Sequence, residues 1–369
     1  MGTSFFAIII LLGVLIFFHE LGHFLVARLF GVGVETFSLG FGPKILGKKI
    51  GITDYRISAI PLGGYVKMVG EDPDAEIDSE DISLSFTHKH PLKRICIVAA
   101  GPFFNIILTI IIFFGVFMAT GSYILKPSVG EVRAGSPAEG AGLQKGDLIT
   151  AIDNVSISRW DELTVIVSKS EGKALKLSIS RDAASLDVTI KPKLEAAKNM
   201  LGEEIQRYLI GISPLGEFIT KDLNPFQAFW ESLKRTYELS ELLIEFVVKL
   251  IQGKISVKDA LGGPIMIASI AGKQAKAGII PFLFLIGFIS INLAILNFFP
   301  LPPLDGGHIL FFSIETIIGK PVHLKVREII QMVGIFLLVT LMIYVIYSDI
   351  MRFDDVIVEY FRKVMGLFN

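Results

Sequence analysis

His19, Glu20 and His23 form an HExxH pattern, the arrangement that a catalytic metal site needs. Residues four apart lie on the same face of a helix, about one turn from each other, so both imidazoles can reach one zinc ion. The glutamate beside the first histidine can deprotonate the attacking water and later carry the proton to the leaving amine. The sequence therefore predicts a zinc site in which Glu20 is the catalytic base.

The setting of this pattern strengthens the prediction. Residues 15–18 and 24–26 on either side of it are all apolar. A charged group at the centre of a membrane helix costs about 2.5–3.5 kcal/mol. Such groups could simply bond to a neighbouring helix, but their number and spacing favour a catalytic role.

Asp305 is the predicted third protein ligand, which a catalytic zinc site requires beside an open water position. It follows the segment 297–303, where three prolines within four residues must end the preceding apolar helix. Irregular backbone at membrane depth is tolerated only where protein or water satisfies it, so this carboxylate should face a cavity. His308, three residues further on, is the competing ligand.

Four apolar segments are long enough to cross a bilayer and would carry these residues, over about 4–30, 95–120, 279–299 and 329–347. The chain is 52% hydrophobic and only 19% charged, against about 25% charged in an average soluble chain. The loop between the first two spans is rich in lysine and arginine. The positive-inside rule then predicts a cytoplasmic loop and an N-terminus on the outside.

Charge and cysteine content exclude other classes of site. The net charge of −1 gives no electrostatic reason to expect nucleic acid as a partner. The single cysteine, Cys96, excludes an intramolecular disulfide and a cysteine-based zinc cluster.

A polar insertion separates the second and third spans, and its size is that of one small domain. Short β-prone stretches alternate with turns, which predicts strands over 129–132, 148–152, 174–179, 186–190 and 209–212 and a helix over 160–168. Residues 225–253 then predict an amphipathic helix that either lies on the membrane surface or packs on the insertion. We divide the chain into three parts: 1–126 with the HExxH and a β-loop, 127–214, and 215–369 with the amphipathic helix and the last two spans.

These motifs together resemble the site-2 protease family of intramembrane zinc metalloproteases, most closely its bacterial RseP type. The first span carries HExxH, and Asn297–Gly307 reads NFFPLPPLDGG, similar to the family's NxxPxPxLDGG. Gly101–Asn105 matches GPxxN, and Gly63–Met68 resembles the membrane-associated β-loop between the first two helices. The resemblance covers nearly the whole chain. It implies zinc bound by His19, His23 and Asp305, Glu20 as the base, and substrate binding by Asn297, Gly64, Tyr65, Val66 and Lys67.

The substrate contacts have alternatives. The β-prone segment 52–68 could pair with an unwound substrate as an added strand, or it could be an ordinary cytoplasmic hairpin. Asn297 could bond to the freed substrate backbone or cap its own broken helix. Asn105 fits a hydrogen bond between helices better than a substrate contact.

The insertion resembles a bacterial PDZ domain through its segments 128–132, 135–138, 141–143 and 146–149. Leu209–Ile212 is similar to the carboxylate-binding loop of circularly permuted members. The RseP type carries two such domains, whereas this chain has room for one. A PDZ groove could capture a peptide C-terminus by strand addition, or the domain could act as a steric gate without binding any peptide.

The expected protein is thus a multi-pass α-helical membrane protein with four transmembrane helices, a membrane-associated β-loop and an inserted α+β PDZ-like domain. By resemblance it is an intramembrane zinc metalloprotease of the bacterial inner membrane, with the PDZ-like domain on the periplasmic side. Its substrates would be single-pass membrane proteins such as anti-sigma factors or signal-peptide remnants. The alternatives are a catalytically silent PDZ scaffold, which has no need of Glu20, and a metal-dependent transporter, which would need paired half-helices that this sequence lacks.

Overall fold

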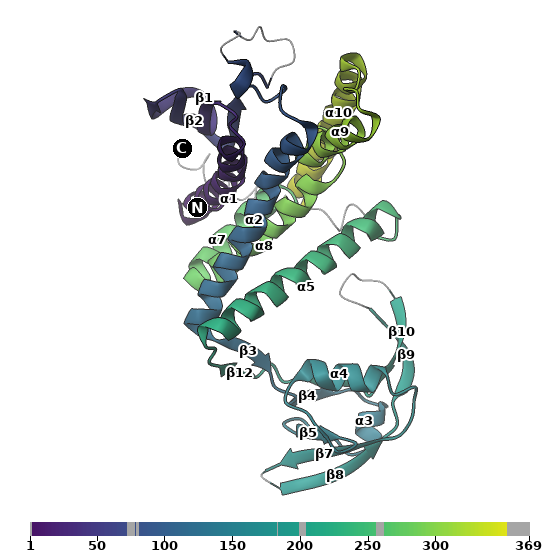
Figure 1. The fold of residues 1–369 in the computed structure, drawn as a ribbon. Coiled ribbons are helices and arrows are strands. Elements are labelled where there is room, and N and C mark those ends of the chain that lie inside the picture. The colour runs from purple at the N-terminus through teal and green to yellow at the C-terminus, as the bar shows by residue number, and fades with distance from the viewer. Residues whose placement is uncertain are drawn as a thin grey trace, which may run out of the picture. The chain divides into compact units, whose positions relative to one another are not determined.

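The computed structural model describes residues 2–71, 78, 81–182, 184–198, 204–255 and 262–352 (Figure 1). The chain divides into two compact units. The helical unit comprises residues 1–116, 231–250 and 256–369, and the β-rich unit comprises residues 117–230 and 251–255. The β-rich unit extends beyond the predicted 127–214 domain at both ends. Of the expected third part, 215–369, the segments 256–261 and 353–369 lie outside the described residues.

Four helices of the described chain are long and apolar enough to cross a membrane: α1 (Gly2–Leu29), α2 (Pro91–Thr120), α8 (Ile279–Phe298) and α10 (Leu324–Arg352). They coincide with the four segments expected from hydropathy. Two shorter helices were not predicted, α7 (Pro264–Ala277) and α9 (Asp305–Ile318). Both are too short to span, and both start directly after a break, α7 after Gly262-Gly263 and α9 after the proline run.

Close packing fixes α1 against α2 and α8. Leu11, Leu15, Leu108, Ala271 and Ile286 form a core that joins α1, α2, α7 and α8. A side chain at Gly22 of α1 would overlap the backbone of Ala100 in α2, so only glycine allows the two backbones to approach this closely. The two histidines of the HExxH face α2, where they contact Ile97 and Asn105.

Hydroxyl groups tie α2 to α8, and a carboxylate ties α10 to α7. Ser290 Oγ donates to Asn105 O at 2.8 Å, and Thr109 Oγ1 donates to Gly287 O at 3.1 Å. Asp349 of α10 is 1% exposed and accepts backbone N–H groups at the start of α7, with distances of 3.0–3.1 Å. Such contacts satisfy polar groups that hydrocarbon cannot.

The segment between α1 and α2 forms two long strands, β1 (Val34–Ile50) and β2 (Thr53–Met68). The first part of β1 pairs with both parts of β2, because Phe37 lies opposite Tyr55 on one side and Val66 on the other. Residues 64–68 thus form an outer strand that, in the described chain, pairs with β1 along one edge only. Its other edge is adjacent to α1, since the Cβ position of Gly64 would lie 3.1 Å from Glu20 Cγ.

The β-rich unit is built on a four-stranded antiparallel sheet in the order β6 (Val155–Ser156), β5 (Leu148–Ile152), β7 (Leu175–Arg181), β8 (Ala184–Ile190). Two helices, α3 (Pro137–Gly140) and α4 (Trp160–Ser168), accompany it. The strand pairs are β3 (Ser122–Leu125) with β12 (Phe218–Lys221), β4 (Val129–Val132) with β11 (Ile212–Pro214), and β9 (Lys193–Lys198) with β10 (Glu204–Leu209). Ile149, Ile152, Leu163, Leu177 and Ile179 are among its buried core residues.

The predicted strand over 209–212 is wrong. Leu209 ends β10 and Ile212 begins β11, so the chain turns between them. Gly211 has a φ of +81°, and the left-handed backbone there interrupts strand geometry. The other four predicted strands and the helix over 160–168 correspond to β4, β5, β7, β8 and α4.

The amphipathic helix expected after the insertion is α5 (Pro225–Ile251). It exposes a narrow apolar stripe, and the large side chains Phe226, Trp230, Tyr237, Ile244 and Ile251 are each more than half exposed. An exposed stripe of this kind is expected of a helix at a membrane surface.

Candidate metal centre

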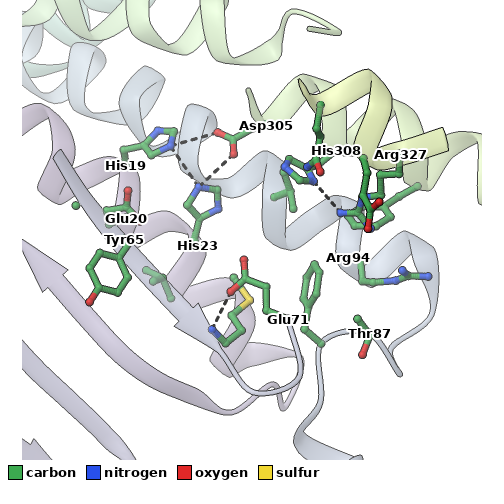
Figure 2. Close-up of a pocket in the computed structure, with 18 of the residues that line it drawn as sticks. His19, Glu20, His23, Tyr65, Glu71, Thr87, Arg94, Asp305, His308 and Arg327 are labelled. Atoms are coloured by element: carbon green, nitrogen blue, oxygen red, sulfur yellow. Dashed lines mark hydrogen bonds and ion pairs between the residues drawn. The ribbon is translucent and has the colours of Figure 1, made fainter. Parts of the chain in front are cut away.

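α1 and α9 bring three side chains together (Figure 2). His19 and His23 are one turn apart on α1, and Asp305 is the first residue of α9. The His19 and His23 Nε2 atoms are 3.3 Å apart. Asp305 Oδ2 lies 3.2 Å from His19 Nε2, and Oδ1 lies 3.7 Å from His23 Nε2.

These three side chains fit a zinc ion. Bonds of about 2.0–2.1 Å to tetrahedral zinc place the ligand atoms about 3.3–3.4 Å from one another. The two distances from His19 Nε2, 3.3 Å to His23 and 3.2 Å to Asp305, are close to this value, and the 3.7 Å between His23 and Asp305 is slightly longer. Asp305 Oδ2 is buried and accepts no hydrogen bond in the described part of the chain, so an ion would satisfy it. Three protein ligands leave the fourth position open for water, the pattern of a catalytic zinc site.

Hydrogen bonds to the far side of each imidazole orient the Nε2 atoms inward. His23 Nδ1 donates to the Ile97 carbonyl of α2 at 2.9 Å. His19 Nδ1 lies 3.3 Å from the side-chain amide of Asn105, whose Oδ1 is buried with no partner among the described residues. The amide oxygen and nitrogen are interchangeable by a 180° rotation, after which Oδ1 accepts the Nδ1 proton of His19. Asn105 thus holds His19 in the tautomer whose Nε2 can bind metal.

Glycines make room for the ligands on both sides. Gly101 of α2 packs against the two imidazoles, and a Cβ there would lie 2.5 Å from His23 Cε1 and 2.9 Å from His19 Cε1. Gly306 and Gly307 lie against the backbone of the proline break, where a Cβ at Gly307 would lie 2.7 Å from Pro302 N. The chain can therefore start α9 directly after the break and place Asp305 at its first position.

Glu20 lies beside the metal cluster rather than within it, next to Tyr65 in Figure 2. One residue along a helix is a rotation of about 100°, so this carboxylate faces the outer strand of the β1–β2 pair. Glu20 borders a cavity of about 500 Å³, called the catalytic pocket below, whose lining includes the three cluster residues. Gly64, Tyr65 and Val66 of the outer strand line the same pocket as Glu20.

The predicted substrate residues separate into two groups. Gly64, Tyr65 and Val66 line the catalytic pocket. Lys67 is exposed and pairs with Glu35 at 2.7 Å, and Asn297 lies half-buried in the last turn of α8. Neither is among the described residues that line the pocket.

His308 does not join the metal cluster. Its Nδ1 lies 3.0 Å from Arg327 Nη2, and because arginine can only donate, the histidine nitrogen accepts this hydrogen bond. His308, the alternative to Asp305 in the sequence analysis, therefore bonds to α10 and not to the metal cluster.

Sequence reasoning missed several residues of the catalytic pocket. Glu71, Arg94 and Arg327 line it, although Glu71 lies between the first two spans and the two arginines lie in the first turns of α2 and α10. Met68 N–H donates to Glu71 Oε2 at 3.1 Å, beside the metal cluster. None of the three carried a signal in the sequence, because Arg327 lies just before the predicted span 329–347.

Comparison with known proteins agrees with this geometry. The model of peptidase family M50 matches residues 7–341. The chain belongs to peptidase family M50. A Campylobacter jejuni protein named "Putative zinc metalloprotease" is 38% identical over 354 residues, which cover 95% of this chain and 94% of the relative. Proteins with the same description from Brucella suis and Clostridium acetobutylicum are 36% and 37% identical, and the alignments cover 92% and 94% of this chain and 93% and 98% of the relatives.

Among solved structures, the PDZ domain of an SdrC-like protein from Listeria innocua is 30% identical. The match covers 24% of this chain and 92% of the Listeria domain, with a TM-score of 0.20.

Family membership confirms the resemblance to site-2 proteases. This M50 protein is a zinc-dependent metalloendopeptidase, and its long apolar helices make it a membrane protein.

Proposed function

We propose that this protease cleaves peptide bonds within or near the transmembrane segments of single-pass membrane proteins. The observation that carries the proposal is the position of the metal cluster. His19 and His23 lie within the apolar helix α1, 10 and 6 residues before its end at Leu29, so the scissile bond must enter the span of that helix. A soluble substrate would have to leave water to reach this position, whereas a transmembrane segment is already in the membrane.

In the proposed mechanism, His19, His23 and Asp305 hold the metal. Bound zinc supplies the Lewis acid that activates water and polarises the scissile carbonyl. Glu20 accepts a proton from the attacking water and delivers it to the leaving nitrogen, because its carboxylate borders the same pocket. Asn105 and the Ile97 carbonyl keep the imidazoles oriented while this happens.

The outer strand of residues 64–68 is the proposed substrate-binding edge. The backbone N–H of Met68 points away from β1, since it donates to the side chain of Glu71. An unwound substrate added along this edge would form main-chain hydrogen bonds in place of those it loses from its own helix. Such a strand would pass directly beside Glu20.

We further propose that the β-rich unit is a PDZ-like module on the periplasmic side of a bacterial inner membrane. A cavity of about 260 Å³ lies between α4 and the β10–β11 turn, lined by Trp160, Leu163, Val167, Ile210 and Ile212 among others. This groove could take an extended C-terminus, and the gating role remains the alternative. Anti-sigma factors and signal-peptide remnants are the substrates that the family resemblance implies. The silent-scaffold and transporter hypotheses have lost their support, because the relatives are described as metalloproteases.

The test is cleavage of a model single-pass protein by detergent-purified enzyme, with and without a zinc chelator. Wild type and Glu241→Gln, an exposed carboxylate on α5, should both yield product, whereas Glu20→Gln and the chelated enzyme should yield none. The same samples receive a soluble unfolded protein. Cleavage of the soluble protein alone would refute the intramembrane proposal, and equal cleavage by Glu20→Gln would refute the mechanism.

A further inference from the structure

A second cavity adjoins the catalytic pocket. It has a volume of about 600 Å³ and is called the basic hollow below, because its described lining holds two arginines and two histidines against one carboxylate, Glu315. Arg94, Phe312 and Arg327 line both cavities, so they form the wall between them. A group that leaves the metal cluster past this wall enters the basic hollow.

The wall carries two guanidinium groups on one aromatic ring. The Arg94 and Arg327 guanidinium carbons lie 4.6 and 5.5 Å from the centroid of Phe312. Arg94 is 7% exposed, and its Nη2 pairs with Glu315 at 2.5 Å, but its Nε is buried with no partner among the described residues. Arg94 therefore has one carboxylate partner and keeps one buried N–H group unpaired among the described residues.

Arg327 has donors to spare. Its hydrogen bond to His308 uses one of five N–H groups, and no carboxylate lies within 4.0 Å of its nitrogens in the part of the chain that the structure describes. Glu71 and Glu328 also line the catalytic pocket, but neither carboxylate forms an ion pair with Arg327. A planar guanidinium with free N–H groups is suited to a carboxylate, which it can bind through two parallel hydrogen bonds.

The backbone adds to the positive potential here. Arg94 lies in the first turn of α2, which starts at Pro91, and Arg327 lies in the first turn of α10, which starts at Leu324. A helix N-terminus carries a partial positive charge from its unpaired N–H groups. Both helices thus direct their positive ends toward the basic hollow.

Peptide hydrolysis creates an anion next to this wall. Water adds to the carbonyl carbon, the C–N bond breaks, the leaving amine takes a proton, and the N-side product gains a carboxyl group that ionises. Moving that carboxylate into hydrocarbon is costly, so it must leave through a polar space. Asp305 and His308 are one turn apart on α9, and Arg327 bonds to His308, so the guanidinium lies one side chain beyond the metal cluster.

We propose that Arg327, supported by Arg94, binds the newly formed C-terminal carboxylate of the N-side product as it leaves the metal. This inference rests on the proposed function, because it requires cleavage at the metal cluster. It assigns the basic hollow as the exit of the acidic product.

The test measures binding of a fluorescent leucine- and alanine-rich octapeptide, with either a free C-terminal carboxylate or a C-terminal amide, to the zinc-loaded full-length protein in neutral detergent. Charge-assisted hydrogen bonds are worth enough to change an affinity about tenfold or more. The ratio of acid to amide affinity should fall about tenfold in Arg327→Gln and by less in Arg327→Lys. Lys325→Gln, which removes an exposed positive charge two residues away, should leave the ratio unchanged. Zinc content and thermal unfolding of each variant exclude a loss of fold.

A second arm repeats the titration with phosphatidylglycerol or phosphatidylcholine added to the micelles. A lipid phosphate as the natural ligand would make phosphatidylglycerol alone displace the acid peptide in wild type but not in Arg327→Gln, and that result would overturn the product assignment. An unchanged acid-to-amide ratio in Arg327→Gln would also overturn it. Wild-type cleavage of the model substrate is run in parallel. Cleavage with an unchanged ratio defeats only this inference, whereas no cleavage defeats the proposed function first.

Discussion

Gly101→Ala should weaken zinc binding by the enzyme without unfolding it. A Cβ at this position would lie 2.5 Å from His23 Cε1 and 2.9 Å from His19 Cε1, whereas ordinary contacts of this kind begin at 3.4 Å. His23 Nε2, the metal-binding atom, lies closer still, so the His23 ring must move by at least about 0.9 Å. Zinc sites tolerate changes of only about 0.2 Å in their bond lengths. We expect a loss of about 100-fold in zinc affinity, equivalent to about 2.7 kcal/mol.

The fold should survive, because the new methyl group displaces the imidazole ring of His23 and not the backbone of α1. Gly115→Ala is the matched control, since Gly115 lies on the same helix and its Cβ would have nothing within 4 Å. That variant should keep its zinc and gain slightly in stability, as alanine is the better helix former. Zinc affinity is measured by competition with a chromogenic chelator, and folding by circular dichroism on heating.

The result that refutes this reasoning is a Gly101→Ala protein whose zinc affinity lies within about threefold of the Gly115→Ala value. It would mean that α1 and α2 can move apart, so that their close contact does not set the ligand geometry. Loss of zinc together with loss of helical signal would point to a folding defect, and would equally contradict the expected separation of the two effects.

Three further predictions concern single polar side chains. Asn105→Leu should lower zinc affinity about 10- to 100-fold by leaving the His19 Nδ1 proton without an acceptor, and chelator competition at unchanged helical content checks this. Burial raises the pKa of Asp147, but hydrogen bonds from Arg181 and the Gln144 amide outweigh it and hold the pKa below its usual value. The ionised Asp147 should therefore contribute its full stabilisation to the β-rich unit above about pH 4, and this stabilisation should be lost as the pH falls further. Both tryptophans of the chain lie in this unit, so urea unfolding of the whole protein followed by tryptophan fluorescence at pH 6 and pH 3 measures the effect. Equal unfolding midpoints at the two pH values would contradict the prediction. Asp349→Ala should destabilise the start of α7 by about 2 kcal/mol, because it leaves buried N–H groups unpaired. The measurement is the temperature at which the variant loses activity in detergent, and a temperature equal to that of the wild type would contradict the prediction.

The sequence by itself predicted the apolar helices and the metal-binding residue types. Hydropathy locates α1, α2, α8 and α10 because a membrane span needs a long apolar run, which is a local property of the chain. The HExxH spacing is also local, since one helical turn places His19 and His23 together. The proline run before Asp305 ends α8, so a break at that point follows from the residue type alone. Gly211 shows the limit of pattern reading, as one left-handed residue turned a predicted strand into a bend between two strands.

The tertiary structure decided which distant groups complete the site. Asp305 and Asn105 are separated from His19 by 286 and 86 residues in sequence, and only the packing of α1, α2 and α9 brings them together. Packing also separated the candidates, since it left Lys67 and Asn297 off the catalytic pocket and directed His308 toward Arg327. Glu71, Arg94 and Arg327 carry no spacing that marks them as a group, because they lie in three separate parts of the chain. A pocket is a property of the surfaces that meet there, and the sequence of any one helix does not contain it.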